Sequence, residues 1–61
     1  MPIVQIEIVK GRTVEQKRAM VDKVTEVLVE TIQCKKEAVT IVIREMDKEH
    51  IAKGGILFSD M

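Results

Sequence analysis

One long helical segment stands between two strand-like runs, and this order limits the possible folds more than any other feature. Apolar and polar residues alternate over residues 3–9, which is typical of a half-buried strand. The run AVTIVIRE, residues 38–45, is dense in β-branched residues and predicts a second strand, covered on both faces. Two strands joined through a helix usually pair in parallel by a right-handed crossover. The sequence therefore predicts a β-α-β unit with parallel strands.

The segment between the strands carries its own start signal. Thr13 followed by Gln16 fits a capping box, so we expect a helix from Val14 to about Gln33. One stripe at helical spacing is apolar and should face the sheet; it comprises Met20, Val21, Val24, Val27, Leu28 and Ile32. Ala19 and Val29 lie off this stripe and leave apolar surface for another subunit. The mixture of Lys and Glu along the helix indicates a solvated face.

After Met46 the periodic pattern weakens. Gly54 and Gly55 can supply a tight turn, and residues 56–58 predict a short strand beside it, so we expect a small C-terminal β-hairpin. No repeat and no linker interrupts the chain. The predicted fold class is α/β (α+β), in a single domain over residues 1–61 that consists of one β-α-β unit and the hairpin.

The chain is too short to enclose a large core. A domain of 61 residues buries about 60% of the surface that its unfolded chain exposes. Cys34 is the single cysteine and His50 the single histidine, so we expect neither an internal disulfide nor a metal site. Because 46% of the residues are nevertheless apolar, we expect a homo-oligomer in which partner subunits cover what one subunit cannot.

Charge and aromatic content argue against nucleic-acid and membrane partners. Ten Lys and Arg residues balance ten Asp and Glu residues, and Phe58 is the only aromatic residue. Nucleic-acid binders usually show a basic stripe and stacking aromatics. No apolar run approaches the length of a membrane span, and no signal peptide is recognisable. Together with the free thiol of Cys34, these features predict a cytoplasmic protein.

The only proline, Pro2, directly follows Met1, and two interpretations of it are open. Proline is tolerated as the first residue of a strand, where its missing N–H need not pair. If Met1 is removed, however, the Pro2 nitrogen becomes a free secondary amine. A chain-terminal amine has a pKa of ~7.7–8.0, and burial or a nearby cation lowers that pKa. Such an amine suits a general base that takes up and returns a proton near pH 7.

Two stretches match one known pattern in both order and spacing. MPIVQIEIVKGRTVEQK places Pro2 at the start and a Gly-Arg turn before the helix, and REMDKEHIAKGG, residues 44–55, fits the later part. Together they resemble the 4-oxalocrotonate tautomerase family. The resemblance implies a β-α-β subunit in a homohexamer, commonly described as a trimer of dimers. It also implies a cofactor-free isomerase acting on enols of 2-oxo acids such as 2-hydroxymuconate, with Pro2 as the general base after removal of Met1.

The resemblance also assigns substrate-binding residues. Arg12 matches an arginine that binds a substrate carboxylate, a contact for which a guanidinium is well suited. Without the resemblance, Arg12 would be interpreted as a solvated turn residue. Val9 and Ile51 are candidate apolar walls, although both equally suit an ordinary core. Thr40 stands where the family's best-known members carry a second arginine, and Ile51 where they carry a phenylalanine, so the charge and the shape of the pocket differ.

We expect no catalytic role for the remaining candidate residues, His50 and Cys34, and two rival functions stay open. We interpret His50 as a solvated histidine, because it is a lone loop histidine beside charged residues. We interpret Cys34 as a structural or exposed thiol, because no second histidine or organised base is expected near it. A non-catalytic oligomeric binding or structural protein of the same fold is one rival function. Hydratase or hydrolytic dehalogenase activity on unsaturated acids is the other, but it requires a group that activates water, and no candidate stands out.

Overall fold

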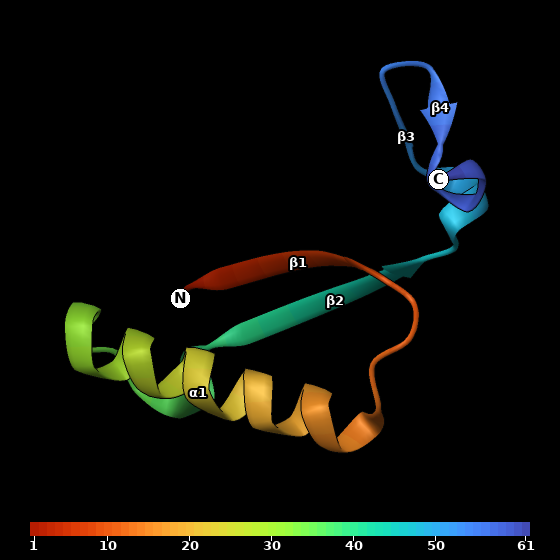
Figure 1. Cartoon of the computed structure of the whole chain (residues 1–61). Helices are drawn as coiled ribbons and strands as arrows, with labels where there is room; N and C mark the ends of the chain where they lie inside the picture. The colour runs from red at the N-terminus through yellow and green to blue at the C-terminus, as the bar shows by residue number, and fades with distance from the viewer.

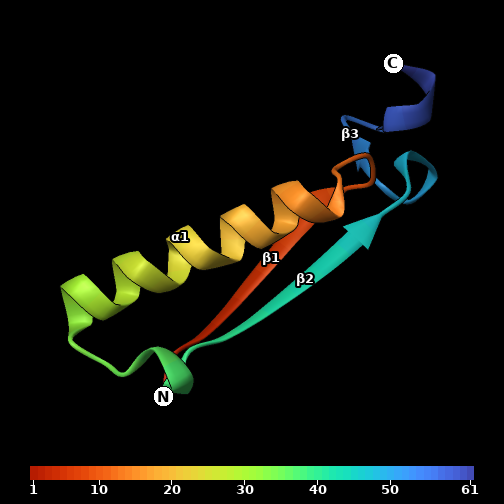
Figure 2. The same ribbon diagram turned by 90° about the horizontal axis from the view of Figure 1, so that it is seen from below.

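The core of the subunit is a two-stranded parallel sheet with one helix on it. The computed structural model describes all residues, 1–61. Figure 1 shows helix α1 lying along one face of the sheet, and Figure 2 shows the same arrangement from the helix side. The predicted β-α-β unit with parallel strands is confirmed. Its elements are β1 (Ile3–Val9), α1 (Val14–Ile32) and β2 (Thr40–Met46).

The two strands divide their side chains between a covered and an uncovered face. Along β1, Val4, Ile6 and Ile8 are half-buried beneath the helix, as the alternation predicts. In the parallel register Ile8 lies opposite Glu45, so Glu45 shares the helix-facing side. Within one subunit the second strand is covered on one face only, so its predicted coverage on both faces stays a prediction for the oligomer. Its Arg44 is exposed because the subunit has no second layer to cover that side.

The second strand begins two residues later than predicted and ends one residue later. Residues Lys36–Ala38 form a 3₁₀ turn, η1, in which the Ala38 N–H donates to the Lys35 carbonyl at 3.0 Å. Ala38 therefore does not join the ladder. At the other end, the Met46 carbonyl accepts from the Lys10 N–H at 2.9 Å, which keeps Met46 within the strand.

The start of α1 is the predicted capping box. The Thr13 hydroxyl accepts from the Gln16 N–H at 3.1 Å, and the Gln16 side-chain oxygen accepts from the Thr13 N–H at 2.9 Å. The helix ends at Ile32, and Gln33 then takes a left-handed conformation with φ of 56°.

Neither α1 nor any other helix of the structure has the length and apolar character that a membrane crossing requires.

The face that α1 turns toward the sheet is only partly the predicted one. Met20, Val21, Val24 and Leu28 are half-buried as expected. Val29 is also half-buried, and it shares a groove with Lys36 of the returning segment. Val27 and Ile32, in contrast, are 55% and 56% exposed, because nothing in the subunit covers that edge of the stripe.

The C-terminal segment forms the predicted hairpin and projects away from the helix (Figure 1). Gly54 and Gly55 have φ values of 60° and 83°, as a two-residue hairpin turn of this kind requires. The second strand of the hairpin is one residue shorter than predicted, because Phe58 begins a 3₁₀ turn. The elements after β2 are η2 (Lys48–His50), β3 (Ala52–Lys53), β4 (Ile56–Leu57) and η3 (Phe58–Asp60).

The isolated subunit has no buried residue at all. Its radius of gyration is 14.7 Å, whereas a compact chain of this length should measure about 10.5 Å. Several large apolar side chains are exposed, on the uncovered sheet face, on the helix and on the hairpin: Ile3, Val14, Val27, Ile32, Ile56 and Leu57. A domain of about 60 residues is marginal by itself even when it is compact. The subunit therefore needs partners to complete its core.

We predict that the chain is a homo-oligomer in solution, with six copies expected from the family resemblance. Association removes the exposed apolar side chains from water, so the melting temperature should rise with protein concentration. Light scattering at micromolar concentration should give about six times the subunit mass of 6.9 kDa. A stably folded monomer at that concentration would contradict the prediction.

Candidate active site

Pro2 and Thr40 lie side by side at the amino end of the sheet. The Pro2 carbonyl accepts from the Thr40 N–H at 3.0 Å, which extends the parallel ladder one residue beyond β1. Met1 is 96% exposed, whereas Pro2 is half-buried. With Met1 attached, the Pro2 nitrogen is a tertiary amide whose lone pair is delocalised. Removal of Met1 would create an amine here without breaking the hydrogen bond of the Pro2 carbonyl.

The other predicted site residues lie toward the opposite end of β1. Val9 is half-buried and pairs with Met46. The chain then turns at Gly11, whose φ of 133° is a conformation that glycine adopts readily. Arg12 follows and is exposed, and its guanidinium makes no hydrogen bond or ion pair within the subunit. Ile51 is half-buried just after η2, and its carbonyl accepts from the Phe58 N–H at 2.9 Å.

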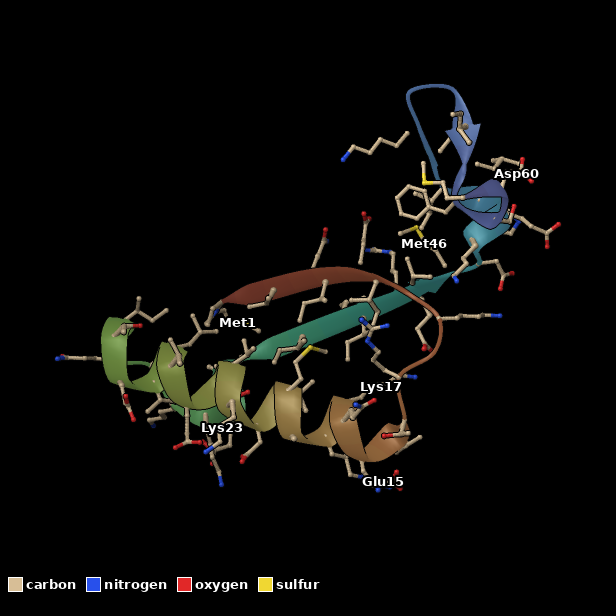
Figure 3. The ribbon with its side chains drawn as sticks, in the orientation of Figure 1. Met1, Glu15, Lys17, Lys23, Met46 and Asp60 are labelled. Carbon is tan, nitrogen blue, oxygen red and sulfur yellow. The ribbon has the colours of Figure 1, made fainter.

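Strand β1 separates the two groups of residues. Its seven residues span ~23 Å at ~3.3 Å per residue. In Figure 3, Met1 lies at one end of the sheet, whereas Met46 and Lys17 lie toward the other end. A small substrate cannot bridge Pro2 and Arg12 of the same subunit. A site that contains both residues must combine the amino end of one subunit with the turn of another.

Two lysine–carboxylate pairs flank the turn that carries Arg12. Lys10 Nζ lies 3.1 Å from Asp47 Oδ1 in an exposed pair. Lys17 Nζ lies 2.7 Å from Glu45 Oε1, and these two side chains are only 24% and 30% exposed. The second pair joins the first turns of α1 to the helix-facing side of β2.

For Lys17, the interpretation of the helix charges as a solvated face is wrong. Glu45 lies on the helix-facing side of β2 and pairs with it. The pair was missed because its partners are far apart in the sequence. The signal that could have found it is the combination of a lysine in the first turns of the helix with a glutamate at an inward position of the second strand.

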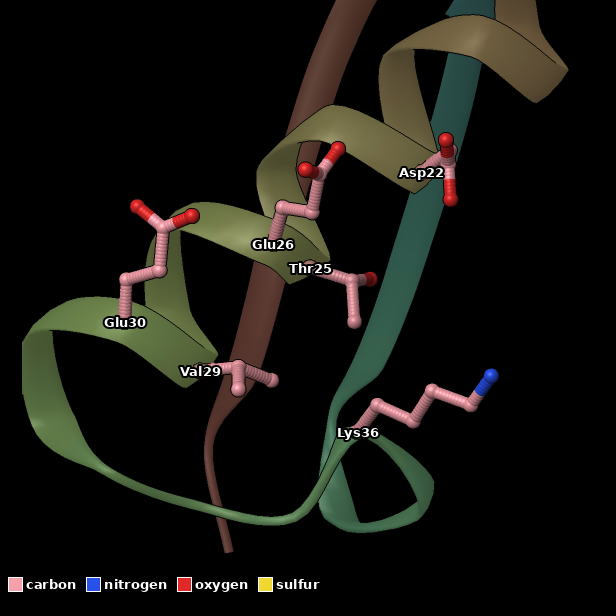
Figure 4. Close-up of a pocket in the computed structure, with 6 residues that line it drawn as sticks. All are labelled: Asp22, Thr25, Glu26, Val29, Glu30 and Lys36. Atoms are coloured by element: carbon pink, nitrogen blue, oxygen red, sulfur yellow. The ribbon is translucent and has the colours of Figure 1, made fainter.

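The grooves of the isolated subunit lie on α1 and contain none of the predicted site residues. One, of about 180 Å³, is lined by Asp22, Thr25, Glu26, Val29, Glu30 and Lys36 (Figure 4). The other, of about 240 Å³, is lined by Lys23, Val24, Val27 and Leu28. Neither end of β1 forms a pocket by itself, which agrees with a site that is completed between subunits.

The remaining candidates take no part in a cluster. His50 is exposed, and its backbone N–H donates to the Asp47 carbonyl at 2.9 Å. Cys34 is a free, half-buried thiol just after α1. No three His, Cys, Asp or Glu side chains approach one another closely enough to hold a metal ion.

The chain is similar to known tautomerases over its whole length. Residues 2–61 match the family of tautomerase enzymes. A probable tautomerase of Halalkalibacterium halodurans is 47% identical over 60 residues, which cover 98% of each chain. The 2-hydroxymuconate tautomerase of Bacillus subtilis is 46% identical over 61 residues, 100% of this chain and 98% of that protein. The crystal structure of YwhB, a homologue of 4-oxalocrotonate tautomerase, matches with a TM-score of 0.93 at 45% identity over 98% of each chain.

Proposed function

Because this chain belongs to the 4-oxalocrotonate tautomerase family of the tautomerase enzymes, it is an isomerase, and we propose that it acts on enols of 2-oxo acids resembling 2-hydroxymuconate. The observation that carries the proposal is the placement of Pro2. It stands behind an exposed Met1, at an open end of the sheet, with its carbonyl bonded to Thr40. This placement supports a free, partly sheltered amine once Met1 is removed.

In the proposed reaction Pro2 is the general base. The neutral amine takes the proton of the enol hydroxyl as the C=O bond forms, and the resulting ammonium returns a proton to a carbon of the conjugated chain. The net change is an isomerisation, so no cofactor is consumed. An amine whose pKa lies near neutrality can both take and return a proton, which is what this exchange requires.

Arg12 is the proposed carboxylate anchor, supplied by a neighbouring subunit. Its guanidinium is exposed and has no partner within its own chain, so it is available for two hydrogen bonds to a carboxylate. Val9 and Ile51 lie toward the same end of the subunit and would line the apolar part of the substrate. We propose that the site forms in a homohexamer, a trimer of dimers, in the cytoplasm.

We predict that a form that retains Met1 folds and assembles normally but loses most of its tautomerase rate. General base catalysis typically contributes ~10²–10⁴-fold, and an amide nitrogen cannot supply it. Ketonisation of an enol substrate, followed by ultraviolet absorbance, measures the difference between the trimmed and untrimmed forms. Intact-mass measurement identifies each form, and circular dichroism and light scattering serve as controls. Equal rates would exclude the proposed role of Pro2.

We predict that two inactive forms complement each other when they are mixed. One form retains Met1 and keeps Arg12, and the other has a free Pro2 and carries Arg12→Ala. If each site takes Pro2 from one subunit and Arg12 from another, about a quarter of the sites in a one-to-one mixed oligomer should be complete. The mixture is denatured, refolded and assayed beside each form refolded alone. No recovery in mixed oligomers would mean that the two residues do not meet across an interface.

We predict a weak preference for diacids, because Thr40 supplies no charge at the Pro2 end of the sheet. A missing charged contact should cost a diacid roughly ten- to a hundredfold in kcat/KM. The kcat/KM for 2-hydroxymuconate should therefore exceed that for phenylenolpyruvate by less than about tenfold. Thr40→Arg should raise the ratio, whereas the uncharged control Thr40→Val should not. A ratio of a hundredfold or more in the unmodified protein would show that another cation takes this role.

A further inference from the structure

Five charged side chains gather around the turn between β1 and α1, and they are paired unevenly. Lys10 binds Asp47 at 3.1 Å, and Lys17 binds Glu45 at 2.7 Å. Arg12 lies between the two lysines in the sequence and has no partner within the subunit. The two carboxylates that the end of β2 brings to this turn, those of Glu45 and Asp47, are thus bound to lysines, and the arginine is left free.

Glu45 is an acceptor that Arg12 could otherwise use. Arg12 immediately precedes the N-cap Thr13, and Lys17 is the fourth residue of α1. The Lys10 N–H donates to the Met46 carbonyl at 2.9 Å, which fixes the chain two residues before Arg12 beside the residue that follows Glu45. A carboxylate bonded to Lys17 therefore lies in the neighbourhood of Arg12. A guanidinium binds a carboxylate with two parallel hydrogen bonds. If Lys17 were absent, the Glu45 carboxylate would therefore bind the Arg12 guanidinium of the same subunit.

We propose that Lys17 is a positioning residue that holds Glu45 against α1 and so keeps Arg12 free for the substrate carboxylate. This inference rests on the proposed function, because it takes Arg12 as the carboxylate anchor. The Lys17–Glu45 pair suits this role better than the Lys10–Asp47 pair. It is shorter, and its side chains are 24% and 30% exposed rather than 61% and 46%. An ion pair that is partly shielded from water is screened less than a more exposed one.

The test compares Lys17→Met with a variant that removes the competing carboxylate as well. Lys17→Met should raise KM for phenylenolpyruvate about tenfold with little change in kcat, because the substrate must displace Glu45 from Arg12. Adding Glu45→Gln to the same chain should return KM to within about twofold of the unmodified value, since the competitor is gone. Glu45→Gln alone should not raise KM.

A matched control removes the same charge elsewhere on the helix. Lys23 pairs with Glu26 at 3.4 Å on the exposed side of α1. Lys23→Met therefore changes the net charge equally and should leave KM unchanged. Lys17→Arg keeps a cation opposite Glu45 and should also preserve KM. Circular dichroism and light scattering confirm that each variant folds and assembles.

The outcomes separate this inference from the proposed function. If Lys17→Met with Glu45→Gln is as impaired as Lys17→Met alone, or if Glu45→Gln alone raises KM, the pair only holds the helix on the sheet and the inference is overturned. If Arg12→Ala raises KM but Lys17→Met does not, the inference also fails while the carboxylate anchor stands. If Arg12→Ala leaves KM unchanged, the proposed anchor is itself wrong.

Discussion

A single helix can cover only one face of the two-stranded sheet, and the rest of the subunit depends on that limit. Val4, Ile6 and Ile8 pack beneath α1 but stay half-buried, and no side chain is withdrawn completely from water. The backbone edges of β1 and β2 are open, as is the second face of the sheet. Open edges and exposed apolar side chains favour association with further copies. Folding and assembly should therefore be strongly coupled.

The same geometry couples assembly to activity. Because β1 spans ~23 Å between the Pro2 end and the Arg12 turn, the groups proposed to share a substrate would have to come from different subunits. A change that weakens subunit contacts would then reduce the rate even where it touches neither residue. The grooves that a lone subunit does possess lie on α1, and they are poor guides to the site for this reason.

Local rules predicted much of the fold, and long-range packing explains what they missed. The capping box at Thr13, the alternation of β1 and the glycine turn of the hairpin each depend on neighbouring residues, and all three are confirmed. The exposure of Val27 and the half-burial of Val29 depend on where the chain returns after α1, which helical periodicity does not specify. The sequence indicated which residues could form the site, and the roles of Pro2 and Arg12 stay predictions. The predicted strand over residues 3–9 already separates Pro2 from Arg12, whereas the pairing of Pro2 with Thr40 became clear only from the structure.

The distribution of charge in the proposed site would fix the orientation of the bound substrate. At the Pro2 end the neighbouring Thr40 is neutral, whereas the turn of another subunit would supply Arg12, with the carboxylate of Glu45 held by Lys17. A substrate with one carboxylate would therefore bind in one orientation, with that group at Arg12 and the reacting carbons near Pro2. The reversed orientation would leave the guanidinium unpaired and bring a carboxylate beside an uncharged threonine. Because binding energy that fixes orientation also fixes the distance between base and substrate, the anchor would contribute to the rate as well as to affinity.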